Sequence, residues 1–103
     1  MMKYRKLVRD NIPAIIEKNG QTPILRVLEE DEYISCLKAK LQEEVKEFLE
    51  DSCIEEICDI YEVLDALKKV LGYSDMDIEA AKSAKAMKNG KFDKRLFLER
   101  VTE

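Results

Sequence analysis

The feature that most constrains the fold is a pair of adjacent amphipathic patterns, each with the period of an α-helix. The first covers residues 31–51. The second begins after Ser52, its expected N-cap, and runs to about Leu71, where Gly72 ends it. At about 100° per residue, the apolar side chains of each pattern fall on one arc of roughly 120°. These side chains are Tyr33, Ile34, Leu37, Leu41, Val45 and Phe48 in the first pattern, and Ile57, Ile60, Val63, Leu64, Leu67 and Leu71 in the second. The chain therefore predicts two long helices with one buried face each.

Each of these apolar faces also contains a carboxylate. Glu44 and Glu56 lie inside the two arcs, and Glu47 and Asp59 lie at their margins, because residues three apart on a helix point in similar directions. A buried carboxylate without a partner costs on the order of several kcal/mol. The same exception on both helices favours a built site. If the helices pack as antiparallel neighbours, four carboxylates converge, and a hard cation such as Mg²⁺ or Mn²⁺ is the expected partner.

The remaining sequence predicts two shorter helices, one on each side of this pair. Asp10 is a plausible N-cap for a helix that has Pro13 in its first turn and ends at about Asn19. Ser74 is the expected N-cap of a helix that continues to Asn89. We therefore predict one all-α domain over residues 1–103, a bundle of about four helices.

Two segments outside the predicted helices contain apolar residues. Residues 21–28 predict an extended connector or a single edge strand. The C-terminal segment 91–103 carries enough apolar side chains to dock on a core or on a partner subunit.

Charge is divided unevenly along the chain. Residues 1–28, 29–65 and 66–103 have net charges of +4, −11 and +3. This order suits a metal site in the middle and cations for an anionic substrate at both ends. It does not suit binding of a nucleic acid polymer, because there is no basic stripe with groove-reading residues.

The basic residues that we expect to reach phosphate lie at the two ends of the chain. Lys6 and Arg9 precede the first helix, although both fit a solvated surface equally well. Lys82, Lys85 and Lys88 repeat every third residue and form one stripe on the last predicted helix.

Several classes of chemistry are excluded by composition. The chain has no His, which removes Ser–His and Cys–His nucleophilic catalysis, and its three Cys cannot form a four-ligand zinc site. The cysteines lack paired spacing and fit reduced thiols. The charged N-terminus has no apolar leader, and no apolar run approaches membrane-spanning length. We expect a cytoplasmic protein without a membrane partner.

Together, these motifs resemble a known superfamily. The pattern L-x-E-E-x-x-E followed by E-x-x-D on successive helices resembles the all-α nucleoside triphosphate pyrophosphohydrolases, the MazG-like and phosphoribosyl-ATP pyrophosphohydrolase superfamily. The opening KLVRDNIPAII and the ending KNGKFDKRLFLE are similar to its small, single-domain, phosphoribosyl-ATP-pyrophosphohydrolase-like branch. The resemblance covers nearly the whole chain.

The resemblance implies a function for the acidic residues. Glu44, Glu47, Glu56 and Asp59 would bind Mg²⁺, and a nucleotide would be hydrolysed between its α and β phosphates to a monophosphate and pyrophosphate. Glu44 or Glu47 would accept the proton of the attacking water. It also implies a homo-oligomer, a dimer or a tetramer, whose sites are completed at interfaces.

The resemblance extends to residues near the C-terminus and breaks at two places. Lys85 and Asn89 match a Lys and an Asn that family members carry after the acidic helices, and Lys88 lies between them. The interval between Glu47 and Glu56 is shorter than in typical MazG domains. Lys91 stands near the place of an Arg in the R-G-G-F of relatives. The chain either lacks this phosphate-binding group or replaces it with Lys91.

Two other functions fit the same acidic helices. A non-catalytic binding module would use them to hold nucleotide, metal or a basic protein. A structural oligomerisation bundle would neutralise the carboxylates with Lys40 or Lys46. A binding surface for proteins would keep its charges facing outward, and the placement of Glu44 and Glu56 on apolar faces disfavours it.

Overall fold

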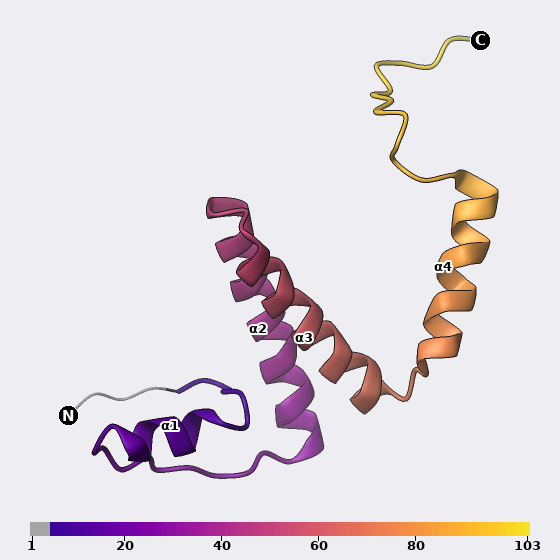
Figure 1. Ribbon diagram of the computed structural model, residues 1–103. Helices are drawn as coiled ribbons and strands as arrows, with labels where there is room; N and C mark the ends of the chain where they lie inside the picture. The colour runs from indigo at the N-terminus through magenta and orange to yellow at the C-terminus, as the bar shows by residue number, and fades with distance from the viewer. Residues whose placement is uncertain (1–4) are drawn as a thin grey trace. The chain divides into compact units, whose positions relative to one another are not determined.

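The computed structural model describes residues 5–103, which form four α-helices and no β-strand (Figure 1). The helices are α1 (Ile12–Lys18), α2 (Glu30–Glu50), α3 (Ile54–Leu71) and α4 (Asp75–Asn89). The predicted all-α class with about four helices is confirmed. The chain divides into two compact units, Met1–Gly72 and Tyr73–Glu103, which are described separately below. The single domain over residues 1–103 stays a prediction.

The first helix begins one residue later than its predicted cap implies. Asn11 is the N-cap residue of α1 in place of Asp10, and its side chain makes no capping hydrogen bond. Pro13 lies in the first turn as predicted, and Gly20 follows the helix with a φ of +83°. The connector 21–28 is irregular and forms no strand, because no second strand is present among residues 5–103 to pair with it.

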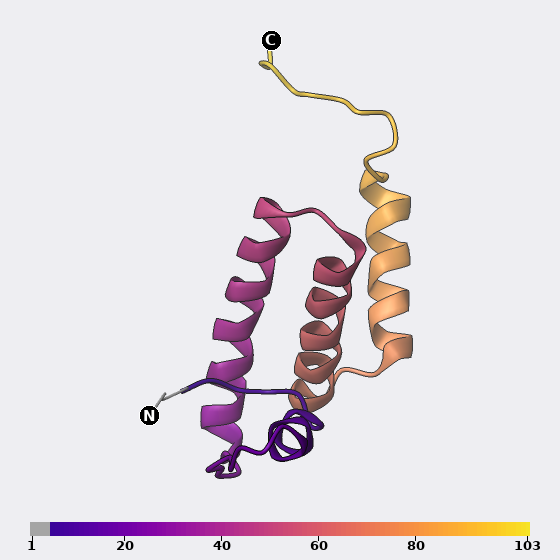
Figure 2. The same cartoon turned by 60° about the vertical axis from the view of Figure 1, so that its left-hand side comes forward.

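Helices α2 and α3 pack side by side as an antiparallel hairpin (Figure 2). The prediction that Ser52 caps α3 is wrong. Cys53 is the N-cap residue of α3, and the Ser52 hydroxyl donates a 2.9 Å hydrogen bond to the Phe48 carbonyl at the end of α2. Gly72 ends α3 as predicted, with a φ of +84° that only glycine adopts without strain. The short connection forces the two acidic segments to face each other.

The core of the first unit is small. Leu37 from α2 and Val63 and Leu67 from α3 are the buried apolar side chains among the described residues, at 3%, 7% and 8% exposure. Partly buried side chains pack around them, namely Leu7, Tyr33, Leu41, Ala66 and Val70. Leu7 therefore attaches the segment before α1 to the α2–α3 hairpin.

The second unit consists of α4 and the C-terminal segment. Ser74 caps α4 as predicted: its hydroxyl accepts a 3.0 Å hydrogen bond from the Asp77 amide, and the Asp77 carboxylate accepts one of 3.3 Å from the Ser74 amide. This reciprocal capping box satisfies two backbone donors of the first turn. No described helix is long and apolar enough to cross a membrane.

The C-terminal segment stays outside any core within its own unit. Its larger apolar side chains are all at least 78% exposed, namely Phe92, Leu96, Phe97, Leu98 and Val101. Docking of this segment on a core or a partner stays a prediction.

Candidate metal centre

The α2–α3 hairpin brings three of the four predicted carboxylates together. One oxygen from each of Glu44, Glu56 and Asp59 lies within 4.8 Å of the other two. Glu44 comes from α2, and the other two come from one face of α3, where their spacing of three residues aligns them. Two ligands on opposite sides of one Mg²⁺ lie about 4 Å apart. A single small cation could therefore contact all three side chains after minor rotamer adjustment. We call these three residues the acidic cluster.

The burial of Glu44 is the strongest evidence that the acidic cluster is a site. This side chain is only 6% exposed, although it carries a carboxylate. Glu44 Oε2 and Glu56 Oε2 are both buried and have no hydrogen-bond partner. Such unpartnered atoms are costly, and buried polar atoms in folded proteins are normally satisfied. Their oxygen chemistry fits a hard divalent cation.

The electrostatic surroundings of Glu44 are unfavourable to its charge. Burial raises the pKa of Glu44 above its usual range, and the neighbouring Glu47 carboxylate raises it further. The Lys40 ammonium lowers this pKa, and the charge of Asp59 raises it. Glu47, the fourth predicted ligand, thus lies beside Glu44 but outside the three converging oxygens. A divalent cation would relieve the repulsion among these groups.

Two basic side chains approach the acidic cluster. Lys40 Nζ lies 3.5 Å from Glu44 Oε1, one turn away on α2. This contact is one that a structural oligomerisation bundle would use to neutralise the carboxylates. Arg9 Nη2 lies 2.6 Å from Asp59 Oδ1, and Arg9 Nη1 lies 3.7 Å from Glu62 Oε1. Sequence reasoning did not relate Glu62 to Arg9, because the two residues lie far apart in the chain. Within the part of the chain that the structure describes, neither Lys40 nor Arg9 forms an ion pair with Glu56.

The predicted phosphate-binding residues of the N-terminal segment have different surroundings. Arg9 contacts the acidic cluster, as described above. Lys6 is exposed and lies on the same segment. Phosphate binding by Lys6 and Arg9 stays a prediction.

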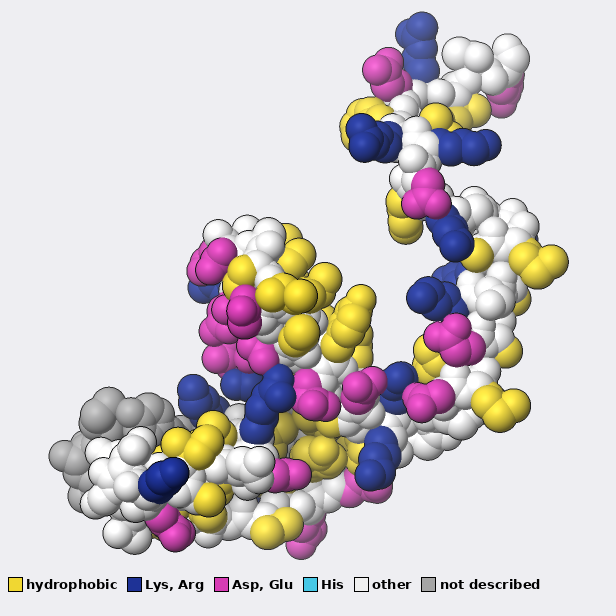
Figure 3. Space-filling view, viewed as in Figure 1, with side chains coloured by type: hydrophobic (Ala, Val, Ile, Leu, Met, Phe, Trp, Pro, Cys, Tyr) yellow, Lys and Arg dark blue, Asp and Glu magenta, His cyan; other side chains and the backbone are white. Residues whose placement is uncertain are grey.

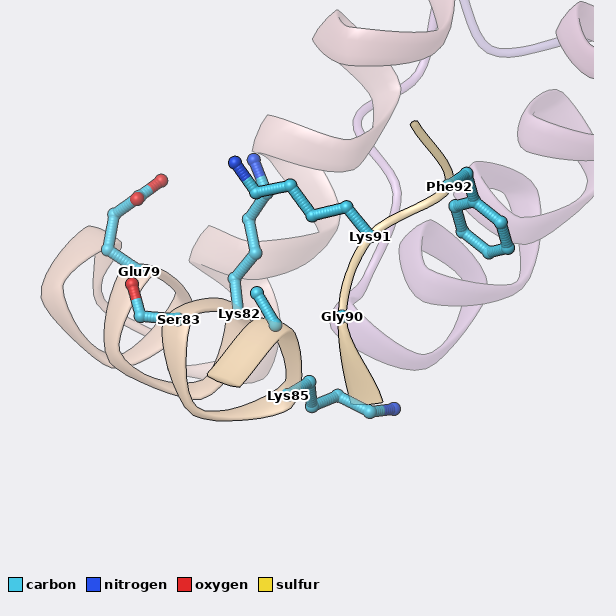
Figure 4. A pocket seen from close by; sticks show the side chains of 8 residues that line it. Glu79, Lys82, Ser83, Lys85, Gly90, Lys91 and Phe92 are labelled. Carbon is cyan, nitrogen blue, oxygen red and sulfur yellow. The ribbon is translucent and has the colours of Figure 1, made fainter. Parts of the chain in front are cut away.

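The second unit has an open pocket of about 460 Å³ where the C-terminal segment leaves α4. Lys85 and Lys91, both predicted to bind phosphate, line this pocket, whereas Lys88 and Asn89 do not. The other lining residues are Glu79, Lys82, Ser83, Ala86, Gly90 and Phe92. In Figure 4 the side chains of Lys82 and Lys91 extend to the same side, and Lys85 extends elsewhere. The pocket thus has the charge to attract an anion.

Sequence reasoning did not assign the Ser83 hydroxyl or the Phe92 ring to this pocket. The three-residue spacing of Lys82 and Lys85 indicated one basic stripe on α4. Ser83 lies next to Lys82, and Phe92 joins the pocket only because the chain turns at Gly90.

Comparison with known proteins yields one short match. A stretch of 42 residues is 55% identical to an uncharacterized protein of Mycolicibacterium smegmatis (strain ATCC 700084 / mc(2)155). The match covers 41% of this chain and 43% of that protein. No family model matches the chain. No solved structure matches it either.

Proposed function

We propose that the chain is a Mg²⁺-dependent nucleotide pyrophosphohydrolase that cleaves the bond between the α and β phosphates. The products would be a nucleoside monophosphate, or a phosphoribosyl-AMP-like nucleotide, and pyrophosphate. The observation that carries the proposal is the acidic cluster, with two buried oxygens that lack partners. The choice of substrate and of the scissile bond rests on the resemblance to the MazG-like and phosphoribosyl-ATP pyrophosphohydrolase superfamily.

Each acidic residue has a role in this proposal. Glu44, Glu56 and Asp59 would hold the cation, Mg²⁺ or Mn²⁺, with their converging oxygens. A bound cation would neutralise phosphate charge and lower the pKa of an attacking water. Glu47 lies next to Glu44 but outside the converging oxygens, and it would accept the proton of that water. A nucleotide substrate and reduced cysteines fit a cytoplasmic protein.

An ion-paired acidic cluster without turnover is the second candidate. The contacts of Lys40 with Glu44 and of Arg9 with Asp59 favour it, because they neutralise part of the cluster without any metal. These contacts leave Glu56 Oε2 without a hydrogen-bond partner. Glu56 therefore discriminates between the two functions.

The deciding experiment measures pyrophosphate release from nucleoside triphosphates, deoxynucleoside triphosphates and phosphoribosyl-ATP, with Mg²⁺ or with EDTA. We expect release only with Mg²⁺. Glu56→Gln should reduce it at least about a hundredfold, because even groups that merely support metal ligands cost 10- to 100-fold in affinity or activity. Glu55→Gln, which removes the same charge from an adjacent exposed position, should leave the rate within about twofold.

Two outcomes would count against the enzyme. One is absence of release from every substrate by folded wild-type protein. The other is unchanged turnover in Glu56→Gln. If wild type and Glu56→Gln are both inactive and the variant is the more stable of the two, the ion-paired cluster is favoured. Removal of a costly buried charge would then stabilise the protein without any loss of function.

We also propose that the chain forms a homodimer or homotetramer through α3. A second apolar stripe on this helix remains open to solvent, with Ile54 at 72%, Tyr61 at 62%, Leu64 at 39% and Leu71 at 44% exposure. Their successive separations of seven, three and seven residues place them on one face. Figure 3 shows hydrophobic side chains gathered over this part of the hairpin, beside acidic ones. A core of three buried side chains is small for an independent fold, and a second copy would enlarge it.

Light scattering tests the oligomer. We expect a mass of at least twice 12.0 kDa for the wild-type protein. Tyr61→Lys should lower it to that of the monomer, because a charge in an apolar interface must lose its water. Ile24→Lys is the control: Ile24 is 93% exposed on the connector 21–28, and its replacement should leave the mass unchanged. A monomeric wild-type protein would contradict the proposal.

A further inference from the structure

Arg9 forms an ion pair with one carboxylate of the acidic cluster, although it lies in a distant part of the sequence. It precedes Asp59 by fifty residues, yet its Nη2 lies 2.6 Å from Asp59 Oδ1. The other guanidinium nitrogen lies 3.7 Å from Glu62, which is outside the cluster. The Arg9 guanidinium thus bridges Asp59, which belongs to the acidic cluster, and Glu62, which does not.

The backbone around Arg9 is anchored, whereas its side chain is half exposed. Leu7 packs against the core of Leu37, Val63 and Leu67, and the Arg9 carbonyl accepts a 3.1 Å hydrogen bond from the Ile12 amide at the start of α1. The Arg9 side chain is 54% exposed. The guanidinium can therefore leave Asp59 by rotation of its own side chain, without detachment of the segment.

A divalent cation bound to the acidic cluster and the Arg9 guanidinium would compete for one carboxylate, that of Asp59. The converging oxygens of the acidic cluster include one from Asp59, and Arg9 binds this same carboxylate. Exposed ion pairs of this kind are weak, whereas a cation gains three carboxylates at once. Cation binding would thus release the guanidinium while Glu62 still holds it near the site. A guanidinium is well suited to bidentate binding of phosphate.

We propose that Arg9 is an exchange residue: it neutralises Asp59 in the metal-free protein and moves to a substrate phosphate when a divalent cation binds the acidic cluster. The inference rests on the proposed metal-dependent function and adds an order of events to it. The cation binds first, and its arrival makes Arg9 available to the anion. Glu62 serves as a positioning residue that keeps the released guanidinium beside the cluster.

The first test measures Mg²⁺ affinity by isothermal titration calorimetry. Arg9→Gln should bind Mg²⁺ about two- to fivefold more tightly than wild type, because its competitor at Asp59 is absent. In the Mg²⁺-saturated protein the same variant should bind pyrophosphate more weakly, since the phosphate loses its guanidinium. Arg26→Gln is the matched control. Arg26 forms an exposed ion pair of 2.9 Å with Glu32, away from the acidic cluster, and its loss should change neither affinity.

The second test observes the guanidinium directly and separates exchange from a general effect of charge. The ¹⁵N side-chain signal of Arg9, assigned by its absence in Arg9→Gln, should shift on addition of Mg²⁺. The Arg26 signal should not shift. An unchanged Arg9 signal in the Mg²⁺-saturated protein would overturn the exchange, as would equal Mg²⁺ affinities of Arg9→Gln and Arg26→Gln.

These outcomes are distinct from failure of the proposed function. If wild-type protein binds no divalent cation, the metal-dependent function and the exchange both fail. If it binds Mg²⁺ but Arg9 keeps its signal and its variant keeps wild-type affinities, the exchange fails and the metal site stands. If Arg9 exchanges but no nucleotide is hydrolysed, the exchange stands and the enzymatic proposal fails.

Discussion

Replacing Glu44 by glutamine should abolish divalent-cation binding and pyrophosphate release. Glu44 is the most buried member of the acidic cluster, and one of its oxygens has no hydrogen-bond partner. An amide supplies a weaker ligand and no negative charge. We expect Mg²⁺ affinity and turnover to fall at least about a hundredfold, which titration calorimetry and pyrophosphate release would measure.

The same substitution should stabilise the metal-free protein. A buried carboxylate with an unsatisfied oxygen is costly, and removing its charge should raise the free energy of unfolding by about 1 kcal/mol. The pKa of Glu44 is raised in the folded state, so the folded protein binds this proton more tightly than the unfolded chain. The contribution of Glu44 to stability is therefore fully present below its ordinary pKa and is lost as pH rises through the folded-state pKa.

Urea denaturation of Glu44→Gln and wild type at several pH values would check this sign. The advantage of the variant should grow as pH rises through the folded-state pKa of Glu44. Glu43→Gln is the matched control, because Glu43 is the adjacent residue on α2 and faces solvent. It should retain cation binding and turnover. Normal turnover in Glu44→Gln would remove this residue from the site.

Replacing Leu37 by alanine should have the largest effect on folding. Leu37 is 3% exposed and is the one α2 side chain among the three buried apolar residues. Loss of a buried leucine costs about 2–5 kcal/mol, through lost burial and the cavity that remains. Because whole domains are stable by only about 5–15 kcal/mol, the variant should lose a large share of its stability.

Circular dichroism during urea denaturation would measure this loss for the metal-free protein. Leu25→Ala provides the control, because Leu25 is 59% exposed on the connector before α2. It should change stability by no more than about 0.5 kcal/mol. If Leu37→Ala unfolds at the same urea concentration as Leu25→Ala, the packing of α2 on α3 does not hold the unit together.

The burial of Glu44 could be predicted from sequence because it depends on local periodicity. Its position relative to Leu37 and Leu41 on one helix places it on the apolar face, and the structure has it at 6% exposure. The same periodicity puts Glu43 and Glu50 on the opposite side of the helix, and both are exposed. Periodicity was less informative about Leu64 and Leu71, which it placed on the buried face of α3 and which are 39% and 44% exposed. Among the described residues of the first unit, α3 packs against one other helix, α2, which is too narrow to cover the whole arc.

Helix ends were predictable only where a capping residue has no nearby competitor. Ser74 is followed by Asp77 at the spacing of a capping box, and both hydrogen bonds form. Ser52 has the same chemistry, but it lies within reach of the last turn of α2 and donates to the Phe48 carbonyl instead. Which of two adjacent helices such a hydroxyl serves depends on the path of the turn between them.

The 3.6-residue period was enough to predict the helical class, the two long amphipathic helices and the carboxylates at their apolar faces. Which of these carboxylates converge depends on how the helices pack. The tertiary structure brought Glu44 to Glu56 and Asp59, left Glu47 beside them, and placed Arg9 on Asp59. Contacts between residues so far apart depend on how the hairpin closes and where Leu7 anchors the N-terminal segment, and no local pattern encodes either.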